Sequence, residues 1–106
     1  MLEVDRAGDT AAVRCRGKLV VGVNSLLYAE VSRLIPGTKR IVLDLTDLTF
    51  MDSVGLGTLV RLYVAARSAG CNLELINLGK RMRELLGIAN LLSVFTIVGE
   101  GDIRMP

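Results

Sequence analysis

The stretch that decides the fold is Phe50-Met51-Asp52-Ser53-Val54-Gly55-Leu56-Gly57. It follows an apolar run, Ile41 to Leu45, that predicts a buried strand, and it precedes Leu59 to Arg67, whose apolar spacing predicts a helix. Asp52 and Ser53 both favour a helix start, because their side-chain oxygens can accept hydrogen bonds from the free N–H groups of the first turn. The stretch therefore lies where the carboxyl end of a strand meets the beginning of a helix, the usual place for a binding site in an open α/β sheet.

Hydrophobic periodicity and turn residues predict the other elements. The expected strands are Leu2–Asp5, Thr10–Arg16, Ile41–Leu45, Leu73–Asn77 and Val94–Val98, with Lys18–Val21 as a candidate short strand; the expected helices are Ser25–Ile35, Ser53–Ala69 and Lys80–Leu86, with one further turn at Ala89–Leu92. A hairpin followed by alternating strands and helices requires right-handed parallel crossovers. We therefore expect a single α/β domain, in which a mixed sheet begins with an antiparallel hairpin, continues with parallel β-α-β units and carries packed helices.

Finer expectations concern the covering of the sheet and the helix ends. The strand Ile41–Leu45 is apolar on both faces apart from Asp44, which is typical of a central parallel strand covered on both sides. Asn24 or Ser25 is expected to cap the first helix. The residues expected on the buried stripe of the second helix are Leu56, Leu59, Val60, Tyr63 and Ala66.

The composition excludes several kinds of site. The 106 residues fit one domain, and 51% of them are hydrophobic with few aromatics, so the core is expected to be aliphatic. The net charge is only +2, and the basic cluster Lys80-Arg81-Met82-Arg83 contains no aromatic residue, so nucleic-acid binding is not expected. There is no histidine, and the only cysteines are Cys15 and Cys71, so we expect no metal site and two free thiols in a reducing compartment. No signal peptide and no apolar run long enough to cross a membrane occur, which predicts a cytoplasmic protein.

Catalysis has little support in the sequence. Histidine, the commonest general base, is absent, and the adjacent side chains of Asp52 and Ser53 rarely meet in a geometry that allows proton transfer. Gly55-Leu56-Gly57 is a weak match to a dinucleotide-binding turn, because Val60 stands where the third glycine would be. The plain interpretation of Asp52-Ser53 is a helix cap. Two glycines so early in a helix lower its stability, and they point to close approach by a neighbour or a partner.

The central stretch also resembles a known family. Ile41 to Gly57, with the sequence Ile-Val-Leu-Asp-Leu-Thr-Asp-Leu-Thr-Phe-Met-Asp-Ser-Val-Gly-Leu-Gly, resembles the signature of STAS domains, the anti-sigma factor antagonist family. The segment from Lys80 to Phe95 is similar to that family's third helix and last strand, and Gly17-Lys18-Leu19 resembles its early Gly-x-Leu-Asp turn. The resemblance implies a STAS domain over residues 1–98, and residues 99–106 are expected to form a loose tail.

The resemblance implies a non-enzymatic module that binds proteins and needs no cofactor. In such antagonists a serine matching Ser53 is phosphorylated by an anti-sigma factor that is also a serine kinase and that itself binds ATP. The unphosphorylated antagonist binds and sequesters the anti-sigma factor, and the phosphorylated form releases it. The residues expected to contact the partner are Val21, Val23, Asn24, Met51, Asp52, Val54, Gly55 and Gly57.

Three departures from the family pattern qualify this expectation. The run Val20-Val21-Gly22-Val23 is apolar where acidic and polar residues are common, which favours a more hydrophobic partner. Val54 stands where serine is frequent, and the family's final helix is missing, so homodimerisation is one way to cover the surface that it leaves. The alternatives are a stressosome-type scaffold, an accessory subunit of a membrane transport system, and a STAS domain that itself binds GTP or ATP.

Overall fold

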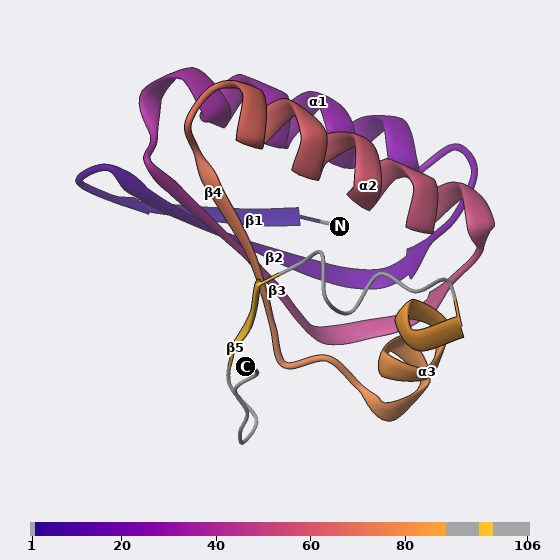
Figure 1. The fold of residues 1–106 in the computed structure, drawn as a ribbon. Coiled ribbons are helices and arrows are strands. Elements are labelled where there is room, and N and C mark those ends of the chain that lie inside the picture. Colours follow the sequence, from indigo (N-terminus) through magenta and orange to yellow (C-terminus); the bar gives the residue numbers. More distant parts are fainter. Residues whose placement is uncertain (1, 89–95, 99–106) are drawn as a thin grey trace.

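Five strands form one mixed sheet in the computed structural model, which describes residues 2–88 and 96–98 (Figure 1). The strands are β1 Leu2–Ala7, β2 Thr10–Leu19, β3 Arg40–Met51, β4 Asn72–Ile76 and β5 Thr96–Val98; the helices are α1 Asn24–Leu34, α2 Ser53–Ser68 and α3 Lys80–Ile88, with a short 3-10 turn at Ile35–Gly37. The strand order is β1-β2-β3-β4-β5. β1 is antiparallel to β2 and every later pair is parallel, so the predicted fold class is confirmed.

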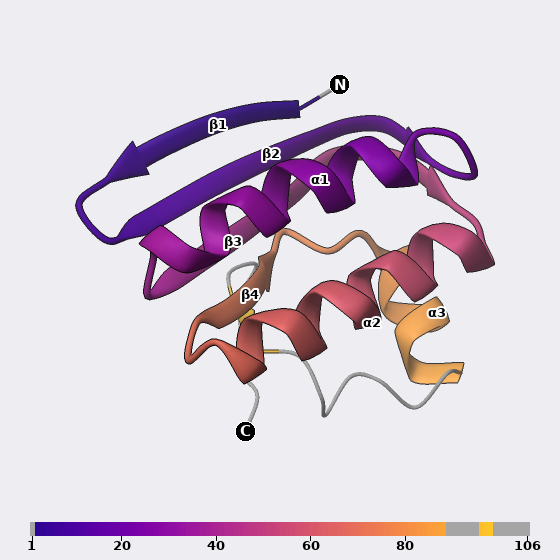
Figure 2. The same cartoon turned by 90° about the horizontal axis from the view of Figure 1, so that it is seen from above.

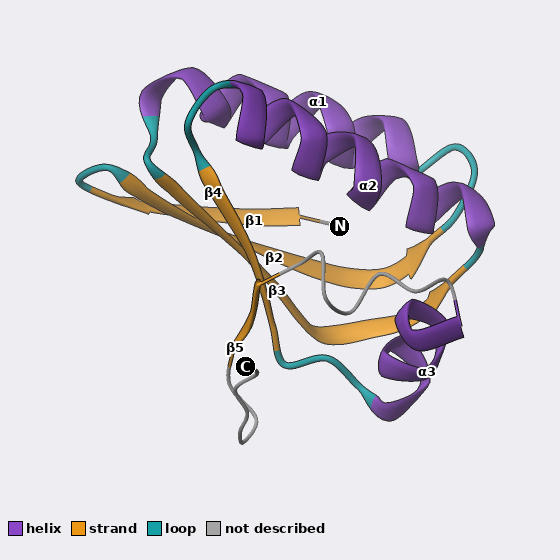
Figure 3. Cartoon of the chain, in the orientation of Figure 1, coloured by secondary structure: helices purple, strands orange, loops and turns teal. Residues whose placement is uncertain are grey.

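Helices α1 and α2 lie side by side over one face of the twisted sheet (Figures 2 and 3). The core between these layers is aliphatic, as the composition predicts. It contains alternate residues of the three central strands together with residues of all three helices: Val13, Cys15, Ile41, Leu43, Leu45, Leu73 and Leu75 from the strands, Leu27, Val31 and Leu34 from α1, Leu59, Leu62 and Ala66 from α2, and Met82 and Leu86 from α3. Cys15 and Cys71 are free, buried thiols, and burial raises the pKa of Cys15 to about 11.

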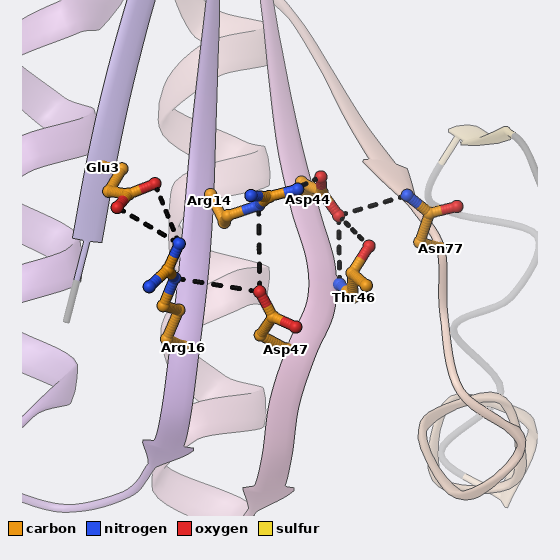
Figure 4. A network of polar contacts seen from close by, with 7 residues as sticks. All are labelled: Glu3, Arg14, Arg16, Asp44, Thr46, Asp47 and Asn77. Atoms are coloured by element: carbon orange, nitrogen blue, oxygen red, sulfur yellow. Dashed lines mark hydrogen bonds and ion pairs between the residues drawn. The ribbon is translucent and has the colours of Figure 1, made fainter.

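The opposite face of the sheet carries a polar network, which lies on the far side of the strands from the helices (Figure 4). Arg16 pairs with Glu3 of β1 at 3.2 Å and with Asp47 of β3 at 3.7 Å, and Arg14 lies between Asp44 and Asp47. Ile41–Leu45 was predicted to be covered on both sides; α1 and α2 both lie on one face of this strand, and the other face carries the polar network. Val42 is nevertheless buried, and by strand alternation it lies on the same face of β3 as Asp44.

Several element boundaries differ from the predictions. Lys18 and Leu19 are the last residues of β2, so no separate strand forms at Lys18–Val21. β3 continues six residues beyond Leu45, to Met51, and two register shifts against β2 break its alternation. The N-cap of α1 is Val23, not Asn24 or Ser25. The turn predicted at 89–92, the first two residues of the predicted strand 94–98 and the predicted tail 99–106 lie outside the described residues.

Helix α2 is rotated relative to the predicted buried stripe. Leu59 and Ala66 are buried as expected, but Leu56, Val60 and Tyr63 are only half-buried. The other buried positions are Gly55, Thr58 and Leu62. The rotation follows from the packing of Gly55 against Leu19 of β2, which brings the Gly55 side of the helix toward the sheet.

Asp44 lies at the centre of the polar network, with its side chain 17% exposed. Its Oδ1 accepts hydrogen bonds from the N–H and hydroxyl groups of Thr46 and from the amide of Asn77, and Arg14 Nε lies 3.6 Å from its Oδ2. Burial alone would raise the pKa of Asp44. The hydrogen bonds and the Arg14 charge outweigh burial and hold this pKa below its ordinary value.

The lowered pKa of Asp44 predicts a loss of stability in acid. Since the folded-state pKa lies below the unfolded-state value of about 3.9, the carboxylate contributes fully above that value, and the contribution is lost as the pH falls through the folded-state pKa. We expect Asp44→Asn to lower the free energy of unfolding by about 1 kcal/mol at neutral pH. The difference from wild type should shrink as the pH falls below about 4, which urea denaturation at several pH values measures. A difference that stays constant with pH would contradict this; Asp47→Asn, at a 46% exposed side chain, is the control.

Candidate functional site

The junction between β3 and α2 is fixed by Asp52. Asp52 is the N-cap of α2, and its Oδ1 accepts a hydrogen bond from the Gly55 N–H at 2.9 Å. Its own N–H donates to the Leu19 carbonyl oxygen at 3.3 Å, which ties the end of β3 to the end of β2. The helix cap predicted from the sequence is therefore present, with Asp52 rather than Ser53 as the capping residue.

Ser53 is the first residue of α2, and it is exposed. The N–H groups of Gly55 and Leu56 are engaged by the side chain and the carbonyl group of Asp52, respectively. The N–H groups of Ser53 and Val54 have no acceptor within the helix, as in any helix start. Together with the helix dipole they favour an anion beside the Ser53 hydroxyl.

The two glycines of this turn have different structural roles. A Cβ on Gly55 would overlap the Leu19 carbonyl oxygen and would lie 2.8 Å from Met51 Cγ, so only glycine fits. A Cβ on Gly57 would meet nothing within 4 Å, and this residue is exposed. Close approach by a neighbour therefore explains Gly55, whereas no neighbour within residues 2–88 and 96–98 gives a packing reason for Gly57.

An open hollow of about 530 Å³ lies beside this turn, between α2 and the start of α1. Its lining residues come from both helices: Asn24, Ser53, Val54, Leu56, Gly57, Thr58, Val60 and Arg61. The guanidinium carbon of Arg61 lies 4.5 Å from the centre of the Tyr28 ring of α1, so a cation–π contact joins the two helices. The hollow is mainly apolar, with one positive charge on its lining.

The loop between β2 and α1 adds an apolar surface. Val21 is 71% exposed, and the next residue, Gly22, has a φ of +97°, a conformation that favours glycine. The loop is held by hydrogen bonds from the N–H groups of Val23 and Asn24 to the Val20 carbonyl oxygen, and Asn24 Oδ1 accepts from the Gly22 N–H. Val21 is therefore exposed to solvent on a turn that these hydrogen bonds hold in place.

The structure brings only part of the predicted partner-binding set to one surface. Asn24, Val54 and Gly57 line the hollow together with Ser53. Met51 and Gly55 are buried beneath it, so they support the turn rather than face a partner. Arg61 was not predicted as a site residue, although Val54, Gly57 or Thr58, and Arg61 share the spacing of one helical face.

Removal of the cap is expected to have a moderate effect. Asp52→Ala should lower the free energy of unfolding by about 1 kcal/mol, because the Gly55 N–H loses its acceptor at the helix start. Asp52→Asn should lose much less, since its side-chain oxygen can still accept. Chemical denaturation of the three proteins measures the difference; equal losses for both variants would show that charge, and not capping, is responsible.

Within residues 2–88 and 96–98, no group of three or more potential ligands could hold a metal ion. In that same part of the chain no helix is long and apolar enough to span a membrane.

Comparison with solved structures gives the same fold. A candidate anti-sigma factor antagonist from Thermotoga maritima superposes with a TM-score of 0.85 at 21% identity, over 93% of this chain and 86% of that one. The anti-sigma factor antagonist SpoIIAA in its unphosphorylated form gives 0.77 at 18% identity, over 95% of this chain and 90% of that one. Its phosphorylated form, described as a Bacillus cell fate determinant, gives 0.76 at 20% identity, over 94% and 93%. A sulfate transporter family protein from Wolinella succinogenes gives 0.73 at 16% identity, over 81% and 70%.

Sequence comparison extends the match. A STAS-domain containing protein of Pseudomonas aeruginosa (strain UCBPP-PA14) is 27% identical over 90 residues, which cover 85% of this chain and 89% of that protein. The family model of the STAS domain matches residues 1–100. The predicted family is therefore confirmed: this chain belongs to the STAS domain family.

Proposed function

We propose that this protein is an anti-sigma factor antagonist, a non-enzymatic module switched by phosphorylation at Ser53. In its unphosphorylated form it binds and sequesters an anti-sigma factor that is also a serine kinase, and ATP is bound by that partner. The observation that carries the proposal is the exposed Ser53 hydroxyl at the first position of α2, beside an apolar hollow and a braced apolar loop. The match to SpoIIAA, solved in both unphosphorylated and phosphorylated forms, supports it.

The switch operates through charge on the docking surface, by which we mean Ser53, the adjacent hollow and the exposed Val21. A phosphate on Ser53 carries about −1.5 to −2 charges at neutral pH and would sit beside the N–H groups that open α2. Those groups and the helix dipole stabilise an anion, so the fold retains its shape. The phosphate instead adds negative charge and bulk where the partner must dock, and Asp52 adds its own charge next to it. In this proposal, residues 1–98 form the domain that binds the partner. Val21, Val23, Asn24 and Val54 contribute contacts around Ser53.

A second candidate function is that of an accessory domain in a membrane transport system. The observation that favours it is the shared fold with the sulfate transporter family protein from Wolinella succinogenes. In that case the docking surface would contact a transport protein, and Ser53 would serve only as part of the helix start.

Phosphorylation by the partner separates these functions. The protein is incubated with ATP and each anti-sigma factor serine kinase of its source organism, and the phosphate is located by mass spectrometry. We expect one phosphate on Ser53, none on Ser53→Ala, and an unchanged reaction with Ser25→Ala, which alters the first turn of α1. Phosphate at another residue, or none with any of these kinases, would overturn the proposed function.

A further inference from the structure

Gly57 lines the hollow beside Ser53 and adds no side chain to it. The residues Val54, Gly57, Thr58 and Arg61 follow one face of α2, and Gly57 leaves a gap between the side chains of Val54 and Arg61. Alanine would fit there without any contact closer than 4 Å and would favour the helix. Gly57 is therefore a destabilising residue at an exposed position where packing among the described residues does not require it. A requirement for open space at that position accounts for the glycine.

Among the described residues that line the hollow, Arg61 is the only one with a positive charge. Its guanidinium group contacts the face of Tyr28, and within the described part of the chain no carboxylate lies within ion-pair distance of it. The cation–π contact fixes the side chain but satisfies none of its five N–H donors. Arg61 is therefore a preorganised site for a carboxylate that this part of the chain does not provide.

We propose that the hollow receives an aliphatic side chain of the anti-sigma factor partner, and that Arg61 pairs with an acidic residue next to that side chain. The inference rests on the proposed function, since it names how that partner docks. The apolar lining formed by Val54, Leu56 and Val60 suits leucine, isoleucine or methionine, and the volume of about 530 Å³ has room for such a side chain. The exposed Val21 and Val54 extend the apolar contact around it.

This arrangement also explains how phosphorylation of Ser53 releases the partner. Ser53 lines the same hollow as Arg61, so a phosphate on its hydroxyl would enter the space that the partner's aliphatic side chain fills. Its charge would repel the partner's carboxylate. Release of the partner then follows from both displacement and repulsion at one place.

The test measures binding of the kinase that phosphorylates Ser53 to wild type, Gly57→Leu and Arg61→Gln, by isothermal titration calorimetry. Gly57→Leu fills the hollow, and we expect it to weaken binding at least about tenfold without lowering the melting temperature, because leucine favours the helix. Arg61→Gln should weaken binding about tenfold and reduce its dependence on salt. Two matched controls should bind within about twofold of wild type: Gly79→Ala, at another glycine with open space, and Arg67→Gln, two turns further along α2.

The outcomes separate this inference from the proposed function. If wild type binds the kinase and both Gly57→Leu and Arg61→Gln bind equally well, the docking inference is wrong and the proposed function stands. If Gly57→Leu fails to fold, Arg61→Gln alone decides. If wild type neither binds nor is phosphorylated by any such kinase, both the proposed function and the docking inference are wrong.

Discussion

Gly55→Ala is expected to destabilise the domain by about 3 kcal/mol, at the upper end of the usual cost of overpacking. The added Cβ would overlap the Leu19 carbonyl oxygen and would lie 2.8 Å from Met51 Cγ. Met51 is buried and has little room to turn away. The Leu19 carbonyl accepts the hydrogen bond from the Asp52 N–H, so moving it would open the junction between β2 and α2.

Gly57→Ala provides the matched control for this prediction. Both changes add one methyl group to the first two turns of α2, but the Cβ at position 57 meets nothing within 4 Å. Helix propensity alone should then apply, and we expect Gly57→Ala to raise the free energy of unfolding by about 0.5–1 kcal/mol.

Urea and thermal denaturation of the three proteins measure these opposite shifts. For a domain of this size, the loss in Gly55→Ala corresponds to a melting temperature at least about 10 °C below that of wild type. A Gly55→Ala protein as stable as wild type would show that β2 and α2 can move apart freely, contrary to the contacts described above.

These two glycines also show what the sequence could and could not predict. The pattern identified both as anomalies for a helix, and helix propensity treats them alike. Only their surroundings distinguish them, because the clash at Gly55 comes from Leu19, which lies 36 residues earlier in the chain. A contact of this kind depends on how β2 and β3 pair, and that register is not encoded in any local spacing.

The strands show a similar limit. The strand predicted at Ile41–Leu45 ended there because the apolar run stops, whereas β3 continues to Met51. The cause is a pair of register shifts against β2, which leave Leu45 and Met51 buried and Leu48 half-buried, at a spacing of three instead of two. The cap at Asp52 was predictable because it depends only on neighbours in sequence. The packing of α1 beside α2 was not predictable from the sequence. It is this packing that forms the hollow and brings Arg61 onto the ring of Tyr28.

Ser53→Asp is expected to abolish partner binding while leaving the fold intact. We expect the dissociation constant for the serine kinase partner to rise at least about 100-fold, which corresponds to about 2.7 kcal/mol. A carboxylate at position 53 enters the docking surface beside Asp52 and the hollow, as a phosphate would. At the same time it lies at the positive end of the helix dipole, where an acidic side chain contributes about 0.3–1 kcal/mol of stability. Its melting temperature should therefore equal or slightly exceed that of wild type.

Ser68→Asp is the matched control, because Ser68 is the last residue of the same helix and is also exposed. The same charge now lies at the negative end of the dipole, so we expect a loss of stability of about 0.3–1 kcal/mol and unchanged partner binding. Melting curves and calorimetric titrations of both variants measure the four quantities. A Ser53→Asp protein that melts several degrees below wild type yet still binds the kinase would overturn the switch, since charge at Ser53 would then act on the fold and not on the docking surface. The opposite pattern, with binding lost and stability kept, is what an exposed serine at a helix start, next to an apolar docking surface, should produce.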